Sequence, residues 1–171
     1  MSNAKISAFL CAILFSAATL LAQSAPGPVP AAIASAKAIF ISNGGGDAGL
    51  FPEPFSGDPS RGYNQLYDAL KASGQYQLVS DPSEADLVLE IKLNAPYGSL
   101  RDNKVAGNAD PRPMFTLTVY DRKTHYALWT LTRTIEYAYL QKTHDHNFDT
   151  AIAAIASQFE ALSGEPATAT P

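Results

Sequence analysis

The sequence has almost no cysteine. Its one cysteine, Cys11, lies inside an apolar run near the amino terminus, from Ile6 to Ala22. If that run is removed, as argued below, no thiol remains in the working protein. Disulfides, thiol nucleophiles and cysteine-ligated metal sites are then excluded, and the fold must be stabilised by its hydrophobic core alone.

Charged residues are also scarce. Asp, Glu, Lys and Arg make up 16% of the sequence, against about a quarter in a typical domain. The 16 acidic residues outnumber the 12 basic ones, which argues against nucleic acid or anionic lipid as a general partner. The serine hydrolase motif G-x-S-x-G is absent as well. We therefore expect no enzymatic activity and no cofactor.

The first 25 residues have the layout of a secretory signal peptide. Lys5 is the single cation, the apolar run follows it, and small or turn-forming residues come next. We expect cleavage after Ala25, with Ala22 and Ser24 as the other candidate sites. The apolar run is short for a membrane span of about 20 residues, which disfavours an uncleaved anchor. The protein is then periplasmic or secreted, in a bacterium.

The remaining chain is organised around one domain. Residues 26–36 are rich in proline and alanine and are interpreted as a linker, while residues 164–171 are interpreted as a disordered tail. Residues 37–163 form the predicted domain, which is long enough to bury a core.

Apolar periodicity predicts seven elements in this domain. Residues 60–73 and 147–163 carry the apolar stripes of amphipathic helices, the first ended by Gly74 and the second capped by Asn147. Strict alternation of apolar and more polar residues makes 87–94 the clearest strand. The five predicted strands are residues 37–42, 75–80, 87–94, 113–121 and 126–139.

The order β-α-β-β-β-β-α predicts an α+β fold. We expect a two-layer sandwich, in which both helices pack on one face of a mostly antiparallel five-stranded sheet. The first strand-helix-strand unit crosses over right-handed. In the last strand, Trp129 and Ile135 mark the buried face, and Arg133 shares their register. Its cation therefore needs a partner, for which Asp121 and Glu160 are the candidates.

The opposite face of the last two strands is rich in threonine and weakly charged. It either remains in water or docks a second protein or another copy of this chain. An edge strand offers strand addition as a further docking mode. The threonines of this candidate binding surface are Thr116, Thr118, Thr130, Thr132 and Thr134.

A glycine-rich segment follows the first predicted strand. Gly44, Gly46 and Gly49 spell G-x-G-x-x-G, the spacing of a dinucleotide-binding loop. That loop must lead directly into a helix, whose amino terminus binds the pyrophosphate. Pro52 and Pro54 prevent a helix here. A surface loop is therefore favoured over a nucleotide site.

Two phenylalanines in the same segment complete the candidate binding surface. Phe51 and Phe55 are either exposed anchors for a partner or side chains that fold back over the core. Folding back is the more common outcome for large apolar residues. The sequence leaves both interpretations open.

A cluster of histidine and aspartate provides the alternative chemistry. His144, Asp145 and His146, with Asp149 nearby, could bind zinc or copper if the segment is extended, because residues two apart on a strand point the same way. His125 lies at the far end of the last predicted strand and cannot complete such a site. The competing interpretation is a solvated loop that leads into a capped helix, and we expect no metal site.

Two segments resemble small exported envelope proteins of bacteria. Residues 80–89, SDPSEADLVL, are similar to their pattern V-x-D-P-x-x-A-D-L-V-L. Residues 119–129 are similar to their D-x-x-T-x-x-x-L-W hairpin. These proteins are uncharacterised and distantly similar to the TolB amino-terminal domain and to lipoprotein activators of cell-wall synthases. The resemblance implies an α+β domain in which Asp121 and Thr124 shape a turn and Trp129 anchors the core. It brings no catalytic residue, and the chain departs from the lipoprotein members because it has no lipidation cysteine.

These observations together predict a non-enzymatic, periplasmic or secreted domain. It binds another envelope protein or envelope component, or associates with itself. The alternative is a metal-binding protein or hydrolase that uses the segment from His144 to His146.

Overall fold

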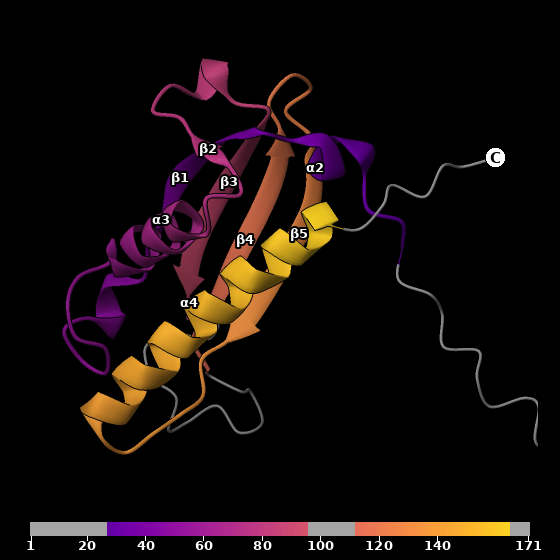
Figure 1. Cartoon of the computed structure of the whole chain (residues 1–171). Helices are drawn as coiled ribbons and strands as arrows, with labels where there is room; N and C mark the ends of the chain where they lie inside the picture. The colour runs from indigo at the N-terminus through magenta and orange to yellow at the C-terminus, as the bar shows by residue number, and fades with distance from the viewer. Residues whose placement is uncertain (1–26, 96–111, 165–171) are drawn as a thin grey trace, which may run out of the picture.

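The computed structural model describes residues 27–95 and 112–164. Within these ranges the chain forms one five-stranded sheet with helices (Figure 1). The strands are β1 (Ala38–Gly46), β2 (Gln77–Leu78), β3 (Leu87–Asn94), β4 (Met114–Asp121) and β5 (Ala127–Thr134). The α-helices are α2 (Ala31–Ser35), α3 (Arg61–Ser73) and α4 (Gln141–Gly164), and the short 3-10 helices are η1 (Ala48–Leu50) and η2 (Pro82–Glu84).

The sheet is mixed, with strand order β2-β1-β3-β4-β5. β1 is parallel to both β2 and β3, whereas β3, β4 and β5 are antiparallel to their neighbours. The prediction of a mostly antiparallel sheet is therefore wrong. The helical crossover through α3 makes β2 parallel to β1. Residues 79–86 then carry the chain past the start of β1, so that β3 begins at the same end.

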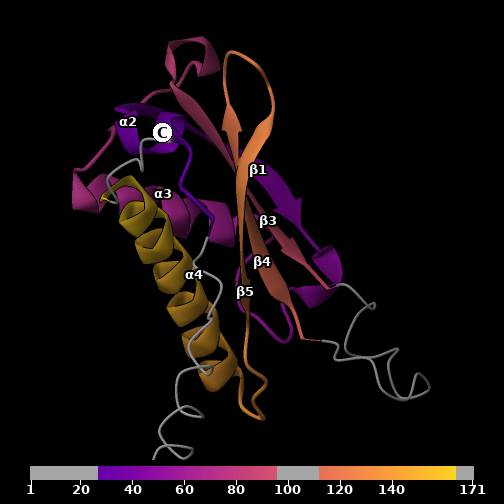
Figure 2. The same ribbon diagram turned by 90° about the vertical axis from the view of Figure 1, so that its right-hand side faces the viewer.

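The core lies between the sheet and the helices. Seen along the sheet in Figure 2, α2, α3 and α4 lie to one side of the strands. Alternate strand residues point to this side and are buried, and the intervening residues are half-buried or exposed. The buried side chains include Ile39, Ile41, Leu87, Leu89, Ile91, Phe115, Leu117 and Val119 from the sheet, and Leu66, Leu70, Phe148, Ile155 and Phe159 from the helices.

Helix α3 confirms the predicted amphipathic helix and its end. Leu66 and Leu70 are buried, and Gly74 after the last turn has φ 64°, the left-handed conformation that glycine adopts freely. Near its start, Gly62 touches the sheet. A Cβ at this position would lie 2.8 Å from a ring carbon of Phe115, so the absence of a side chain allows the close approach.

Helix α4 begins at Gln141, six residues before the predicted start at Asn147. Asn147 is therefore not the cap. Its Nδ2 donates to the backbone carbonyl of Glu136 at 3.0 Å and ties the helix to the segment that follows β5. The first turns contain few apolar residues, which is why periodicity did not detect them. His144 supplies the buried position there, one turn before Phe148.

Strand β5 ends at Thr134, not at Tyr139, and lies at the edge of the sheet. Trp129 has the predicted orientation, because it pairs with the buried Val119, but it is only half-buried. Arg133 is exposed and makes no ion pair within the described part of the chain. The predicted pairing with Asp121 or Glu160 is therefore wrong, because an edge strand leaves room for a solvated cation.

The proline- and alanine-rich segment contributes to the core. Residues 31–35 form α2, and Val29, Ile33 and Ala36 are buried against the rest of the molecule. The segment was expected to be a linker, and the structure instead packs it against the core. An apolar residue at every third or fourth position gives even a short helix one side that can be buried. The predicted signal peptide and most of the predicted tail lie outside the described residues.

The two motifs of the envelope-protein resemblance stabilise turns and strand ends. Asp81 Oδ1 accepts a hydrogen bond from the Ser83 amide at the start of η2. Asp86 Oδ2 accepts from the amides of Lys37 and Ala38, which fixes the start of β1 beside β3.

In the hairpin between β4 and β5, Asp121 Oδ1 accepts from the Lys123 and Thr124 amides. Thr124 Oγ1 accepts from the Tyr126 amide. His125 completes the turn with φ 61°. The predicted turn-forming role of Asp121 and Thr124 is confirmed.

Candidate functional site

The sheet face opposite the buried residues is the first candidate. We call it the open face. Cross-strand register aligns its residues in rows, such as Glu90, Thr118 and Thr130 across β3, β4 and β5, and Lys92, Thr116 and Thr132 beside them. The predicted threonine surface is therefore assembled as expected. The open face consists of Phe40, Ser42, Val88, Glu90, Lys92, Asn94, Met114, Thr116, Thr118, Tyr120, Thr130, Thr132 and Thr134.

The open face is flat, hydroxyl-rich and nearly uncharged. Glu90 and Lys92 are its only ionisable side chains apart from Tyr120. Thr130, Thr132 and Thr134 are exposed, and so is Lys92, whereas the other residues of the open face are half-buried by their neighbours. Such a surface offers hydrogen bonds and apolar contact together. None of the residues that form it is a histidine or a cysteine.

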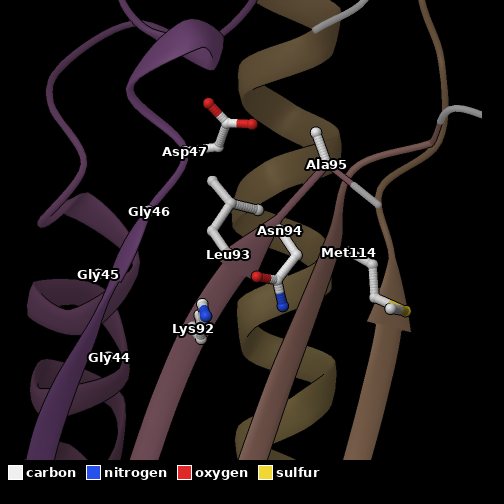
Figure 3. Close-up of a pocket in the computed structure, with 9 residues that line it drawn as sticks. All are labelled: Gly44, Gly45, Gly46, Asp47, Lys92, Leu93, Asn94, Ala95 and Met114. Carbon is white, nitrogen blue, oxygen red and sulfur yellow. The ribbon is translucent and has the colours of Figure 1, made fainter. Parts of the chain in front are cut away.

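A shallow pocket of about 480 Å³ lies at one end of this face. Figure 3 shows it at the ends of β1 and β3, with Asp47, Lys92, Asn94 and Met114 around it. Gly44, Gly45 and Gly46 form one wall, so two of the three motif glycines line the pocket and Gly49 does not. Its lining residues are Gly44, Gly45, Gly46, Asp47, Lys92, Leu93, Asn94, Ala95 and Met114.

The glycines have a packing role that excludes a dinucleotide loop. Gly44 and Gly46 belong to β1, and Gly49 lies in η1, which Asp47 caps by accepting from the Gly49 amide. A Cβ on Gly44 would lie 2.9 Å from the carbonyl oxygen of Ile91. The next α-helix begins only at Arg61, so the helix amino terminus that must bind pyrophosphate is absent from this segment.

The two phenylalanines do not form an exposed surface. Phe55 is 1% exposed and its ring centroid lies 5.1 Å from that of Phe148 in α4. Phe51 is half-buried and packs against both rings. Phe55 is therefore not an exposed anchor and folds back over the core, whereas Phe51 packs beside it and keeps part of its surface exposed. Burial against α4 removes more apolar surface from water than exposure in a loop.

The histidine and aspartate cluster is not brought together. The segment is helical, so His144 and His146 point in nearly opposite directions. His144 is buried and meets the rings of Phe55 and Tyr137 edge-on, whereas His146 is exposed. Asp149 pairs with Arg61 instead. Over residues 27–95 and 112–164, no three His, Cys, Asp or Glu side chains converge in a way that could hold a metal ion.

The strongest polar cluster surrounds Arg61, which sequence reasoning missed. Its Nη1 lies 2.5 Å from Asp145 Oδ1 and its Nη2 lies 2.6 Å from Asp149 Oδ1. Nη1 also donates to the Ser56 carbonyl at 3.0 Å, and the Ser56 amide donates to Asp145. The guanidinium carbon lies 4.4 Å from the Phe148 ring centroid. No local pattern links residues more than eighty positions apart, so the sequence carried no signal for this cluster.

Electrostatics in this cluster favour the ionised pair. Burial alone would raise the pKa of Asp145, but hydrogen bonds from Arg61 and the Ser56 amide outweigh it and lower that pKa below its usual value. Burial likewise opposes the charge on Arg61, and the hydrogen bonds to Asp145 and Asp149 reverse this effect and raise the pKa of Arg61. The cluster joins α3, α4 and the loop before α3 that contains Ser56. Its residues do not line the pocket at the end of the open face or the groove described next.

A second groove runs beside the sheet edge, between β5 and α4. Its volume is about 500 Å³. We call it the edge groove. It is lined by Thr132, Arg133, Thr134, Glu136, Asn147, Thr150 and Ala151.

No protein-family model matches the chain, and no curated protein matches it either. Among solved structures, a PelC dodecamer from Paraburkholderia phytofirmans is 17% identical with a TM-score of 0.45, over 79% of this chain and 95% of that one. A Xanthomonas campestris protein assigned to DUF330 is 13% identical with a TM-score of 0.45, over 80% and 85%. The uncharacterised lipoprotein B of Nitrosomonas europaea is 12% identical with a TM-score of 0.36, over 81% and 86%.

At these identities and TM-scores, the likenesses do not extend to function. The resemblance to TolB and to activators of cell-wall synthases stays a prediction. Within the described residues, no helix has both the length and the hydropathy needed to span a bilayer.

Proposed function

We propose that this chain is an exported, non-enzymatic domain that binds another protein of the bacterial envelope through its open face. The observation that carries the proposal is the asymmetry of the sheet. The helices lie to one side of the strands (Figure 2). On the other side Thr130, Thr132 and Thr134 are exposed, and Thr116 and Thr118 are half-buried beside them. Among the described residues, the side of the sheet opposite the helices is left available for contact.

The chemistry of the open face supports a protein partner. Its threonines can donate and accept hydrogen bonds without the desolvation penalty of a charge. Half-buried Phe40, Met114 and Tyr120 add apolar and aromatic contact area, which protein interfaces use more than the rest of a surface. Glu90 and Lys92 lie on neighbouring rows of β3 and give the surface a small local polarity.

The placement of the ionisable residues supports a binding role over catalysis. Arg61, Asp145 and Asp149 are occupied by one another and tie α3 to α4. His144 packs between aromatic rings. These residues serve the fold, so the alternative metal-binding or hydrolase function has no geometric support from them.

The proposal is tested by site-specific cross-linking. Thr118→Cys places a thiol at the centre of the open face, and Asp68→Cys places one on the exposed side of α3, with Cys11→Ala in both chains. Each chain is expressed in the native host, and its thiol is then coupled to a photo-cross-linker. We expect one defined envelope protein to be captured from position 118 and not from position 68.

The captured protein is then purified and titrated against the chain. Thr118→Arg should weaken its binding by about tenfold or more, because a charge at the centre of an interface is desolvated without a partner. Equal capture from both positions, or unchanged affinity for Thr118→Arg, would contradict the proposal.

A further inference from the structure

The outer edge of β5 has backbone groups without a partner among the described residues. The Ile135 amide donates to the Pro113 carbonyl at 2.8 Å, so Ile135 faces β4. Because hydrogen-bonding direction alternates along an antiparallel strand, the N–H and C=O groups of Thr130, Thr132 and Thr134 point away from β4. In the described ranges, no hydrogen bond to another segment uses these outward groups.

This edge lacks the features that usually prevent strand pairing. β5 is eight residues long, contains no proline and carries one charge, Arg133. The opposite edge strand, β2, has only two residues. Long edge strands with few charges are templates for pairing with another chain.

Exposed apolar side chains gather at both ends of the same strand. Tyr126, which precedes β5, is 74% exposed. Tyr137, Tyr139 and Leu140 follow β5 and are 55%, 103% and 69% exposed. These four are the large apolar side chains that are exposed in the part of the chain that the structure describes. Their position favours an interface that extends along β5 and past both its ends.

We propose that β5 pairs with β5 of a second copy of this chain, antiparallel, about a two-fold axis at Leu131. This inference concerns the sheet edge and goes beyond the proposed function of the open face. The two edges would form one continuous ten-stranded sheet with the helices of both copies on the same side.

The register is selected by the side chains. With Leu131 opposite its own copy, Trp129 lies opposite Arg133 of the second copy, and Arg133 lies opposite its Trp129. A guanidinium against an indole ring is a favourable cation–π pair. Arg133 makes no ion pair within the described residues and is free to take this partner. Shifting the axis by one residue in either direction loses both pairs.

The backbone fits the same register. Thr130 would lie opposite Thr132 of the second copy, and both residues present outward N–H and C=O groups, so each pair can exchange hydrogen bonds. Threonine opposite threonine is also a favourable cross-strand pair. The two-fold axis also brings Tyr126 of one copy near Tyr137 of the other, because the beginning of one antiparallel strand lies beside the end of its partner.

A second copy fits this edge better than an unrelated extended peptide. Strand addition alone would accept many sequences. Here one strand carries both partners of each complementary pair. Trp129 and Arg133 are each two residues from Leu131. Tyr126 and Tyr137 lie at nearly equal distances on either side of it. The edge groove between β5 and α4 leaves open space beside Arg133 and Thr134 for the incoming strand.

Disulfide trapping tests the register. Leu131→Cys, with Cys11→Ala, places two thiols across the axis at a non-hydrogen-bonded pair, where Cα atoms are about 4.5 Å apart and a disulfide can form. Arg133→Cys is the matched control. It is more exposed, but the register separates it from its copy by four residues, about 13 Å. We expect oxidised dimer from Leu131→Cys and little from Arg133→Cys.

Sedimentation of the chain in its exported form tests the pairing itself. Thr132→Pro removes an outward N–H without touching the bonds to β4, and Thr132→Ala keeps that N–H as the control. We expect a reversible dimer whose dissociation constant rises by about tenfold or more in Thr132→Pro and changes little in Thr132→Ala. The circular dichroism melt of Thr132→Pro, read in dilute solution, should stay cooperative.

Three results would overturn the inference. They are a monomer at every concentration tested, a dimer that Thr132→Pro leaves intact, and cross-linking of Arg133→Cys that matches Leu131→Cys. Capture of an envelope protein at position 118 would be unaffected by these results, so failure here is distinct from failure of the proposed function.

Discussion

Arg61 and Asp145 join the first residue of α3 to the first turns of α4, with Nη1 and Oδ1 2.5 Å apart. Their side chains are 15% and 23% exposed, so the pair is partly desolvated. The same guanidinium binds Asp149 and lies over the Phe148 ring. One side chain therefore fixes the angle between two helices and closes the loop that contains Ser56.

Replacing Arg61 should destabilise the fold. Arg61→Met keeps the apolar stem but leaves Asp145 without its cation, and we expect the free energy of unfolding to fall by about 1–3 kcal/mol. Urea unfolding measures this change. Lys71→Met is the matched control, because Lys71 is exposed and its Nζ lies 5.9 Å from the Tyr67 ring. Equal stability of both variants would show that the cluster does not hold the helices together.

Acid should weaken the same contact. The pKa of Asp145 is lower in the folded protein than in the unfolded chain. Its contribution to stability is therefore fully present above about pH 4, the unfolded value, and is lost as the pH falls through the folded pKa.

Unfolding free energies measured between about pH 6 and pH 2 should fall less steeply for Asp145→Asn than for the wild type. Asp68→Asn, on the exposed side of α3, removes a carboxylate without removing a contact to Arg61. If the unfolding free energy of Asp145→Asn falls with pH as steeply as that of the wild type, Asp145 does not make the expected contribution to acid sensitivity.

Adding one methyl group at Gly62 should give no gain in stability, although alanine is the better helix former. The new Cβ would lie 2.8 Å from the Phe115 ring. That ring is fully buried, with the Phe148 ring edge-on at 4.9 Å. Overpacking costs about 1–3 kcal/mol, against a helix-propensity gain of about 1 kcal/mol.

We therefore expect Gly62→Ala to be neutral or destabilised by up to about 2 kcal/mol, and Asn64→Ala on the exposed side of the same helix to be slightly stabilised. Thermal melts compare the two variants. A Gly62→Ala chain as stable as Asn64→Ala would mean that α3 lies farther from β4 than the structure shows.

Shortening Ile33 tests whether α2 belongs to the core. Ile33 is fully buried, and its replacement by alanine should lower the free energy of unfolding by about 2–5 kcal/mol. Ser35→Ala, at an exposed position in the same short helix, is the control. Identical denaturation midpoints for Ile33→Ala and the wild type would restore the linker interpretation of residues 26–36.

Strands with strict alternation could be predicted from the sequence almost to the residue. Residues 87–94 and 113–121 match β3 and β4 because one side of each faces the core and the other does not. The parallel pairing of β1 with β3 could not be predicted. Strand direction depends on how η2 and Asp86 carry the chain past β1, and no periodicity encodes it.

The candidate surface could be predicted only where it follows from alternation. The threonines of β4 and β5 are on one face because their spacing is two. The exposure of Arg133 and the half-burial of Trp129 could not be predicted, since they depend on β5 being an edge strand. The burial of Phe55 and His144 likewise depends on a contact between segments nearly ninety residues apart.

The central place of β1 has a consequence for how the protein is made. β1 is the first strand to leave the ribosome, yet both of its neighbours, β2 and β3, are later in the chain. Until β3 has been synthesised, Ile39 and Ile41 lack the strand that pairs with them on that side. We therefore expect the apolar side chains of β1 to be accessible to chaperones until β2 and β3 have emerged.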